Sequence, residues 1–292
     1  MFEEHRQLLV GVAYRILGSV ADAEDVVQEA WLRWSGVDQG VVEDDKAYLI
    51  RVTSRLAIDR LRWAKSRRES YVGPWLPEPI STAPDVAEHV ELAESVELAM
   101  LVVLETLSPL ERAVFVLREA FDLPFAEIAE IIGRAEPATR QLARRAREHV
   151  QDKRPRFVTD RDERREMTER FINASSNGDL DDLIAMLSQD VTMVTDSGGK
   201  ARAPLRALLG VDNVTRFLLS VTTAEGVAKF MASIGMPGDV ELEFRVQEVN
   251  AAPAVVVSVG GRVITVLSLL VVDGRIATIY LMANPDKLQR LV

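Results

Sequence analysis

Residues 107–150 read LSPLERAVFVLREAFDLPFAEIAEIIGRAEPATRQLARRAREHV, and this stretch decides the architecture of the middle of the chain. Its opening tetrad at 108–111 supplies a serine cap, a proline for the first helical position and a glutamate for the third, which is a helix-start signature. A second short helix is predicted over 125–132, Gly133 ends it, and a basic helix follows over 137–150. Two short helices joined by a glycine-containing turn, the second of them basic, predict a helix-turn-helix unit.

The basic helix is two-sided. Apolar residues on one side can face a core, and polar residues occupy the rest of the surface: Arg140, Gln141, Arg144, Arg145 and Arg147. An arginine-lined helix suits the major groove, because arginine pairs bidentately with guanine or clamps phosphate. The alternative is a solvated basic face on an ordinary helix. The helix-start signature and the glycine turn favour DNA binding.

A second basic segment covers residues 46–68, which contain no glycine or proline and predict a long helix. Its candidate DNA-binding residues are Arg51, Arg55, Arg60, Arg62, Trp63 and Arg67. Basic side chains beside an exposed aromatic ring suit melted DNA, where phosphates are neutralised and bases stack. The alternative is that Trp63 belongs to the core and the arginines pair with local acids such as Asp59. This segment alone does not decide between the two.

The net charge of −10 argues against a nucleic-acid partner only if it is spread evenly, and it is not. Residues 73–106 contain seven acidic residues and no lysine or arginine, whereas 107–157 carry ten basic and eight acidic residues. Local clusters of charge, and not the total, create the field that phosphates experience. The acidic excess therefore does not exclude DNA binding.

The remaining bulk features bound the class of protein. A chain of 292 residues is long enough for two or three domains. The absence of cysteine excludes disulfides and thiol chemistry. Apolar runs are too short to span a bilayer and no signal peptide is visible, so we expect a cytoplasmic protein without a membrane partner.

Beyond residue 155 the pattern changes from helical to mixed. Helices are predicted over 162–174, 179–187 and 212–221, and strands over 240–249, 254–259, 263–272 and 276–282. Gly-Gly and Asp-Gly pairs between the β-branched runs are hairpin signals. The sequence therefore predicts an antiparallel meander packed against helices, an α+β domain.

Ordered motifs in the first half resemble those of extracytoplasmic-function (ECF) RNA polymerase sigma factors. Residues 22–29 (DAEDVVQE), followed by Trp31, and 56–62 (LAIDRLR) resemble their region 2; 107–115, 125–129 and 145–147 resemble their region 4. Segments 71–79, 196–200 and 284–288 resemble signatures of a subgroup with a fused SnoaL-like domain.

The resemblance implies a multidomain fold with two all-α sigma domains followed by an α+β SnoaL-like cone with a curved antiparallel sheet. The implied divisions are a region 2 domain over 1–72, an acidic linker over 73–106, a region 4 helix-turn-helix domain over 107–157 and a SnoaL-like regulatory domain over 158–292. The implied partners are core RNA polymerase, through its β′ clamp helices and β flap, and promoter DNA.

The resemblance also implies residue roles. The clamp helices would contact Asp22, Asp25, Gln28, Glu29 and Trp31. The 46–68 residues named above would read and open the −10 element. On the 137–150 helix, Arg140, Gln141 and Arg144 would lie nearest the bases of the −35 element, with Arg145 and Arg147 nearer phosphate.

The subgroup segments lead to a hypothesis of intramolecular regulation. Its residues are Trp75, Leu76 and Pro77 of the linker with Asp196, Gly198, Gly199, Lys200, Asn284, Pro285, Asp286 and Lys287 of the C-terminal domain. We expect contacts between these segments to hold the two DNA-reading domains in one arrangement. Asp196 and Lys200 are expected to form a turn-stabilising ion pair and not an acid–base pair.

Catalysis and cofactors are not expected. The histidines, His5, His89 and His149, lie outside the C-terminal domain, and no cluster has metal-ligand spacing. The alternatives for the C-terminal domain are a small-ligand sensor, with the ligand in the cone, and a vestigial enzyme. Two alternatives to a sigma factor are a stand-alone helix-turn-helix regulator that senses a ligand, and a cone-domain enzyme tethered to DNA-binding helices.

Overall fold

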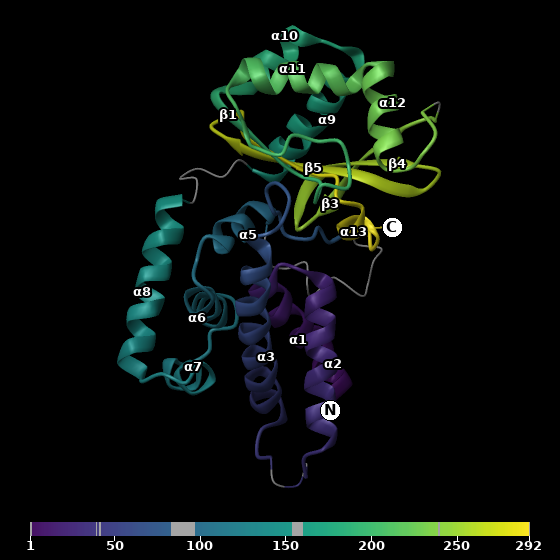
Figure 1. The fold of residues 1–292 in the computed structure, drawn as a ribbon. Coiled ribbons are helices and arrows are strands. Elements are labelled where there is room, and N and C mark those ends of the chain that lie inside the picture. The colour runs from purple at the N-terminus through teal and green to yellow at the C-terminus, as the bar shows by residue number, and fades with distance from the viewer. Residues whose placement is uncertain are drawn as a thin grey trace. The chain divides into compact units, whose positions relative to one another are not determined.

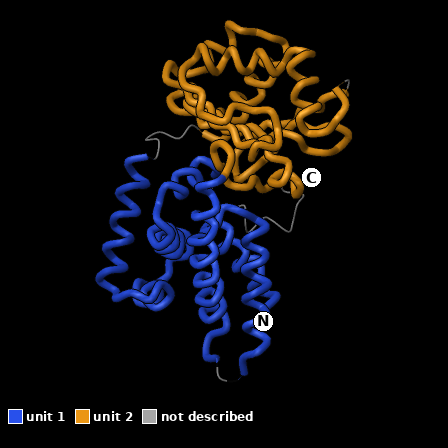
Figure 2. The backbone as a smooth tube through the Cα atoms, in the orientation of Figure 1, with its two compact units in different colours: residues 1–70, 84–154 blue, residues 71–83, 155–292 orange. Residues whose placement is uncertain are grey.

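The computed structural model describes residues 2–38, 40, 42–82, 97–153, 160–238 and 240–291. The chain divides into two compact units, residues 1–70 with 84–154, and residues 71–83 with 155–292 (Figure 2). The segment 71–83 therefore belongs to the second unit, although the chain returns to the first unit after it. Residues 83–96 of the acidic linker predicted over 73–106 lie outside the described residues.

The first unit begins with three helices, α1 (Phe2–Leu17), α2 (Val20–Ser35) and α3 (Asp45–Arg68). The Ser19 side chain accepts from the Asp22 N–H and caps α2, and Asp44 caps α3 in the same way. Leu9, Leu49 and Leu61 are fully buried. These residues lie on the faces where the three helices meet, so the regularly spaced apolar residues form the core of a helical bundle.

The first unit also contains α5 (Leu98–Glu105), α6 (Pro109–Glu119), α7 (Phe125–Ile132) and α8 (Glu136–Lys153). The predicted helix start at 108–111 is present, because Ser108 and Glu111 form a reciprocal capping box. Gly133 adopts φ +66°, which ends α7 with a left-handed residue. The helix-turn-helix prediction is thus met by α7, a tight turn and α8.

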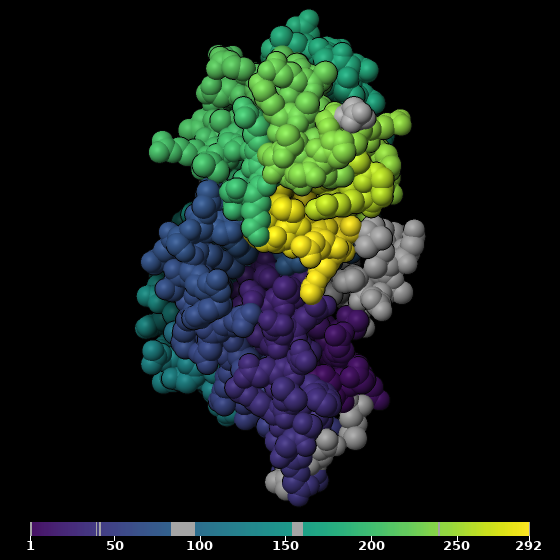
Figure 3. Space-filling view, turned by 45° about the vertical axis from the view of Figure 1, so that its right-hand side comes forward, coloured from purple at the N-terminus to yellow at the C-terminus, as the bar shows by residue number. Residues whose placement is uncertain are grey.

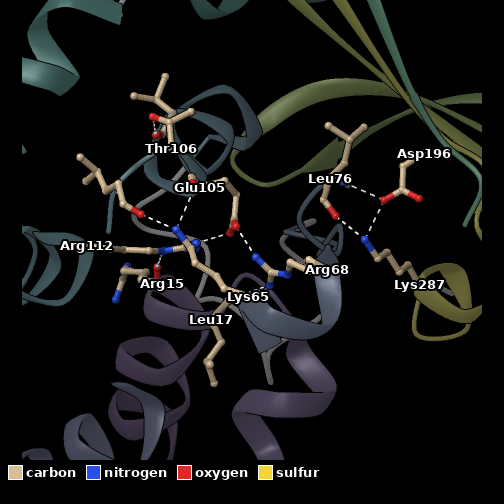
Figure 4. A network of polar contacts seen from close by, with 12 residues as sticks. Arg15, Leu17, Lys65, Arg68, Leu76, Glu105, Thr106, Arg112, Asp196 and Lys287 are labelled. Atoms are coloured by element: carbon tan, nitrogen blue, oxygen red, sulfur yellow. Dashed lines mark hydrogen bonds and ion pairs between the residues drawn. The ribbon is translucent and has the colours of Figure 1, made fainter. Parts of the chain in front are cut away.

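A buried ionic network joins α1, α3, α5 and α6 (Figure 4). Glu105 accepts from Arg68 and Arg112, and the Arg112 side chain is fully buried. The Arg112 Nε also donates to the Arg15 carbonyl at 3.0 Å. Lys65 donates to the carbonyl groups of Glu105 and Leu107. The network explains why both helical groups belong to one compact unit.

The second unit is an α+β domain. Its helices are α9 (Arg161–Asn177), α10 (Leu180–Met186), α11 (Val211–Thr222), α12 (Ala224–Ser233) and α13 (Pro285–Leu288); its strands are β1 (Leu187–Asp196), β2 (Leu208–Leu209), β3 (Glu243–Val249), β4 (Ala252–Val259), β5 (Arg262–Val272) and β6 (Arg275–Met282). The strands form one six-stranded sheet in the order β2-β1-β6-β5-β4-β3. Helices α9, α11 and α12 cover one face of this curved sheet (Figure 1).

The predicted fold class is confirmed, with one correction to the sheet. Strands β3 to β6 form the expected antiparallel meander, but β1 pairs with β6 in parallel, with Asp196 opposite Met282. The three helices after β1 are α11, α12 and α13, and the sequence did not predict α12. The parallel pair brings the end of β1 and the chain after β6 to the same edge of the sheet. Asp196 therefore lies beside the segment that begins at Ala283.

The described residues 71–82, called the strap from here on, lie on the second unit. Ser81 forms an antiparallel bridge with Val249 at the end of β3. The Thr82 N–H donates to the Glu248 carbonyl and the Asn250 N–H donates to the Ile80 carbonyl, both at 2.9 Å. Residues 76–81 are all buried. The proline-rich segment is therefore extended and packed.

Candidate functional sites

The predicted polymerase contacts on α2 divide into two groups. Gln28, Glu29 and Trp31 are exposed, and the Trp31 side chain is joined by Leu32, which is 57% exposed. Asp22 and Asp25 instead pair with Arg60 of α3 at 2.7 Å and 3.0 Å. The hydrogen bond from Arg60 to Asp22 is the main cause that raises the pKa of the Arg60 guanidinium. The structure therefore leaves an exposed Trp31–Leu32 surface, and the sequence missed Leu32.

Trp63 is not a core residue. Its side chain is 52% exposed, and the guanidinium groups of Arg67 and Arg60 lie 4.5 Å and 5.4 Å from its ring centroid. Stacked guanidinium groups hold an aromatic ring in a defined orientation. Asp59 pairs with Arg62 at 2.8 Å, as expected for an ion-pair partner. The end of α3 thus presents an aromatic ring with basic neighbours.

Two other candidates for the −10 element, Arg51 and Arg55, contact α7. The Arg55 Nη2 donates to the Glu130 carbonyl at 2.7 Å and its Nε to the Ile131 carbonyl at 3.3 Å. Arg51 lies 3.6 Å from the Glu130 carboxylate. Both arginines satisfy groups at the end of α7, so in this arrangement they help to hold the helix-turn-helix against α3.

The four arginines of α8 lie at or near the surface, and each pairs with an acid. Arg140 pairs with Glu136, Arg144 with Glu148, Arg145 with Glu111, and Arg147 with Glu119. Arg140 also lies 4.6 Å above the Phe125 ring, and Gln141 is exposed. Surface ion pairs of this kind contribute about 0–1 kcal/mol each, so a phosphate or base can displace the acid at low cost.

Asp196, at the end of β1, anchors the strap (Figure 4). The carboxylate is fully buried and accepts four hydrogen bonds: from Tyr71 Oη at 2.6 Å, Leu76 N at 2.8 Å, Gly198 N at 3.1 Å and Lys287 Nζ at 2.7 Å. Two of the four donors belong to the strap. A buried carboxylate needs such partners, so it fixes the position of the chain that supplies them.

The predicted ion pair between Asp196 and Lys200 is wrong. Asp196 pairs with Lys287, and Lys200 pairs with the exposed carboxylate of Asp286 on α13. The reason is the turn between them, where Gly198 and Gly199 have φ of +56° and +72°. The parallel β1–β6 pairing also carries the segment after β6 to Asp196, and with it Lys287.

Lys287 and Asn284 complete the anchor from α13. The Lys287 Nζ donates to the Leu76 carbonyl at 2.5 Å and lies 4.0 Å from the centroid of the Trp75 ring. The Asn284 Nδ2 donates to Tyr71 Oη at 2.8 Å. Pro285 occupies the first turn of α13, where a proline is tolerated. The short helix α13 and its cap residue Asn284 therefore contact the Leu76 carbonyl and the side chains of Tyr71 and Trp75 in the strap.

The two glycines of the turn allow the strap to approach. A Cβ at Gly198 would lie 2.6 Å from Asn284 Nδ2, and one at Gly199 would lie 3.1 Å from Val72. Both residues also have positive φ, which favours glycine. A side chain at either position would push against the anchor or the strap. Pro77 lies buried in the middle of the strap.

Tyr71 is protonated far into the alkaline range. Burial is the main cause that raises the pKa of its phenol, and the hydrogen bond to the Asp196 carboxylate with its negative charge adds to it. The phenol therefore acts as a donor to Asp196 at neutral pH.

A second anchor lies at the β3–β4 turn, and sequence reasoning missed it. The Ile80 N–H donates to Asn250 Oδ1 at 3.2 Å, Gln247 Nε2 donates to Ser81 Oγ at 2.7 Å, and the Ala251 N–H donates to Thr82 Oγ1 at 3.0 Å. Asn250 has φ +51°, and asparagine is one of the residues that tolerate this conformation. An asparagine between two β-branched runs signals the turn in the sequence, but nothing in it signals the partner.

Comparisons with known proteins match two parts of the first unit to family models. Residues 1–67 match the family model of sigma-70 region 2, and residues 97–150 match that of sigma-70 region 4. The chain is 43% identical over 293 residues to the ECF RNA polymerase sigma factor SigJ of Mycobacterium tuberculosis, with 98% of this chain and 91% of SigJ covered.

The chain belongs to the ECF RNA polymerase sigma factors.

Two further comparisons extend the similarity of this sigma factor along its full length. It is 36% identical over 290 residues to the probable ECF RNA polymerase sigma factor SigI of M. tuberculosis, with 98% of this chain and 93% of SigI covered. The crystal structure of M. tuberculosis SigJ matches with a TM-score of 0.77 and 40% identity over 98% of this chain and 96% of that chain. The function is that of a sigma factor for promoter-specific transcription initiation.

The second unit of this sigma factor also encloses a cavity of about 290 Å³. Helices α9, α11 and α12 form one wall, and strands β3 to β6 form the other. Apolar side chains dominate the lining. Among the described residues that line the cavity there is no aspartate, glutamate or histidine.

The described part of the chain shows neither a membrane-spanning helix nor a metal-binding cluster. No described helix is long and apolar enough to cross a membrane. Among the described residues, no group of three or more His, Cys, Asp or Glu side chains is placed to hold a metal ion.

Proposed function

We propose that this sigma factor binds core RNA polymerase through α2, reads promoter DNA through α3 and α8, and is regulated by its own second unit through the strap. The observation that carries the regulatory part is the Asp196–Lys287 anchor. A fully buried carboxylate and a nearly buried ammonium group hold a segment that also connects the two sigma regions.

The polymerase contact is proposed for the exposed part of α2. Gln28 and Glu29 supply polar groups, and Trp31 with Leu32 supplies a large apolar area at the surface. Tryptophan is among the residues that contribute most to protein interfaces. Asp22 and Asp25 then act indirectly, because their pairs with Arg60 fix α2 against α3. A stand-alone DNA-binding regulator would have no use for this surface.

The promoter contacts are proposed for two basic surfaces. Trp63 with Arg62 and Arg67 offers a ring and charges to unpaired bases and phosphates of the −10 element. On α8, Arg140, Gln141 and Arg144 are proposed for the bases of the −35 element and Arg145 and Arg147 for its phosphates. Arg51 and Arg55 can reach DNA only after they release Glu130 and Ile131.

Regulation is proposed to act by holding or releasing the strap. The similarity to ECF sigma factors implies that the linker over 73–106 threads towards the active-site and RNA-exit channels of the polymerase, and residues 73–82 of the strap belong to that linker. While Asp196, Lys287 and Asn250 hold the strap on the second unit, it is not free to follow another path. Release of the strap would therefore favour the transcribing form.

We propose no catalytic role for the second unit. The cavity offers no carboxylate or histidine among its described lining residues, and Asp196 and Lys287 already satisfy each other and the strap. Acid–base catalysis needs such groups within reach of a substrate. The small-ligand alternative is supported by the cavity itself.

The experiment that tests the initiation function is run-off transcription with core polymerase on the DNA upstream of the protein's own gene. We expect a discrete transcript that requires both core polymerase and this sigma factor. DNA binding by the isolated chain, with neither co-purification of core polymerase nor a transcript on any promoter selected from a library, would support the stand-alone regulator instead.

A further inference from the structure

The cavity in the second unit is built like a small-molecule site. Protein interiors are close-packed and contain few voids larger than a water molecule. A space of about 290 Å³ lies near the lower end of the range for small-molecule pockets, about 300–1,000 Å³. It is also about twice the volume of an engineered cavity of ~150 Å³ that holds one benzene ring. The strap contacts make no use of this space.

The lining asks for an apolar ligand body. Phe171, Phe217, Phe230 and Met231 line the helical wall, while Val255, Val257 and Leu267 line the sheet wall. Phe244 also lines the cavity and is 46% exposed, so an aromatic ring lies where the cavity meets solvent. Dry, apolar cavities bind apolar molecules because water gains little inside them.

One charged residue is present among the described lining residues, and it is Arg202. Its side chain is exposed, and no ion pair joins it to another described residue. The Lys229 ammonium group, and after it the charge of Arg202, lowers the pKa of the Glu225 carboxyl. Arg202 also lines an adjoining surface depression with Glu225 and Lys229, which pair with each other. The mouth region therefore has one positive charge in excess, which favours an anionic end group on the ligand.

A second polar feature lies on the helical wall. Ser175 is one of the residues that line the cavity, and its hydroxyl is buried and has no hydrogen-bond partner among the described residues. Buried polar groups are nearly always satisfied, so such a hydroxyl points to a partner that enters from outside the chain. A water molecule that accompanies the ligand would satisfy the hydroxyl.

We infer that the cavity binds a small apolar carboxylate, with its hydrocarbon part among the aromatic and aliphatic side chains and its carboxylate at Arg202. The volume suits a body of about ten to twelve non-hydrogen atoms when it is scaled from the benzene cavity. The inference does not depend on regulation by the strap. It makes the second unit a ligand-binding domain in its own right.

The test uses the full chain and titrates octanoate and decanoate, with 1-octanol and 1-decanol as uncharged matches, below micelle-forming concentrations, by calorimetry. We expect saturable binding of one molecule per chain, with the acids bound about tenfold more tightly than the alcohols, since a hydrogen bond to a charged group contributes about 1.5–3 kcal/mol and solvent exposure reduces it. Arg202→Met should remove this preference for acids. Arg262→Met, which changes an exposed arginine outside the cavity, should leave it unchanged.

A second variant tests the place of binding. Ser175→Leu fills part of the cavity and removes the unpartnered hydroxyl, so it should weaken acids and alcohols alike without lowering the unfolding temperature. The inference is overturned if no probe saturates, if acids and alcohols bind the unaltered chain equally, or if Arg202→Met keeps the preference for acids. Since the Arg202 side chain is exposed, its replacement should not prevent folding.

Discussion

At the scale of single residues, the chemistry of the strap depends on Asp196. A fully buried carboxylate is costly unless it is paired and hydrogen-bonded, and here Lys287 supplies the charge while Tyr71, Leu76 and Gly198 supply the other donors. The buried Asp196 carboxylate therefore stabilises the second unit only while the strap occupies this position and supplies two of its donors.

Replacing Asp196 with asparagine should therefore destabilise the second unit. We expect a loss of about 2–4 kcal/mol in the free energy of unfolding, because the Lys287 ammonium group is left nearly buried without its counter-charge. Urea unfolding of the full chain measures it. Lys200→Met is the matched control: its pair with Asp286 is more than half exposed on both sides and should contribute about 0–1 kcal/mol. Equal losses in the two variants would contradict the anchor.

Tyr71 gives a pH dependence with a defined sign. Its pKa is raised in the folded state above the ordinary value of about 10, chiefly by burial and then by Asp196. A raised pKa contributes stability that is fully present below pH 10 and is lost as the pH rises above it. Tyr71→Phe should therefore be less stable than the unaltered chain at pH 8, and the gap should narrow above pH 10. Denaturant unfolding at both pH values checks this, and a constant gap would refute it.

At the scale of elements, α8 presents its arginines in pairs that are easily exchanged. Arg144 is the most exposed of the ion-paired arginines on this helix, at 80% of its side chain, and its partner Glu148 lies one turn along. Burial of Ala143 and Ala146 fixes the opposite side of the helix on α6 and α7. The basic side therefore keeps its orientation when the ion pairs open.

Arg144→Ala should weaken promoter recognition without affecting folding. We expect a loss of about 1–3 kcal/mol in discrimination for the −35 element, with the free energy of unfolding changed by less than about 0.5 kcal/mol. Run-off transcription on promoters with intact and substituted −35 elements measures the first quantity. Lys229→Ala, which removes a similar one-turn ion pair on α12, should leave discrimination intact. A loss on both promoters alike would argue against a −35 contact.

The sequence predicted most elements because their signals are local. The capping box at Ser108, the left-handed Gly133 and the β-branched runs from 240 to 282 each lie within a few residues of the structure that they specify. Helix α12 was missed because Gly226 weakens its helical pattern and Thr223, which caps it, follows directly on α11.

Long-range pairings were the part that the sequence could not supply. Asp196, Lys200 and Lys287 were all selected as candidates, yet which lysine pairs with Asp196 depends on the parallel β1–β6 register and on the glycine turn. The Asn250 anchor was missed for the same reason, since its strap partner lies 170 residues away. Charge sign and spacing alone do not distinguish such partners.

At the scale of the whole molecule, two compact units share one chain that crosses between them more than once. The strap connects the two sigma regions in sequence but contributes to the second unit in structure. Near the C-terminus, the chain drawn in yellow lies on the visible surface of the second unit (Figure 3). Residues of the strap anchor and of the cavity lie close together in the chain. Arg202 of the cavity follows the glycine turn, and Leu281 of the cavity lies three residues before Asn284 of the anchor.

The division over 1–72, 73–106, 107–157 and 158–292 stays a prediction about independent domains. The anchors hold the strap, which is part of the linker between the two sigma regions, on the second unit. Any change that weakens these anchors therefore frees the linker to take another path. We therefore expect transcript output to depend on the stability of the anchor.

The most direct measurement is run-off transcription with core polymerase and full-length chains that differ only at the anchor. Lys287→Met removes the donor to Asp196 and Leu76 and the charge over Trp75, so it should release the strap and raise transcript output about threefold or more by shifting the population of the released form. Lys200→Met should match the unaltered chain. Equal output from all three chains, with Lys287→Met shown to be folded, would contradict regulation through the strap.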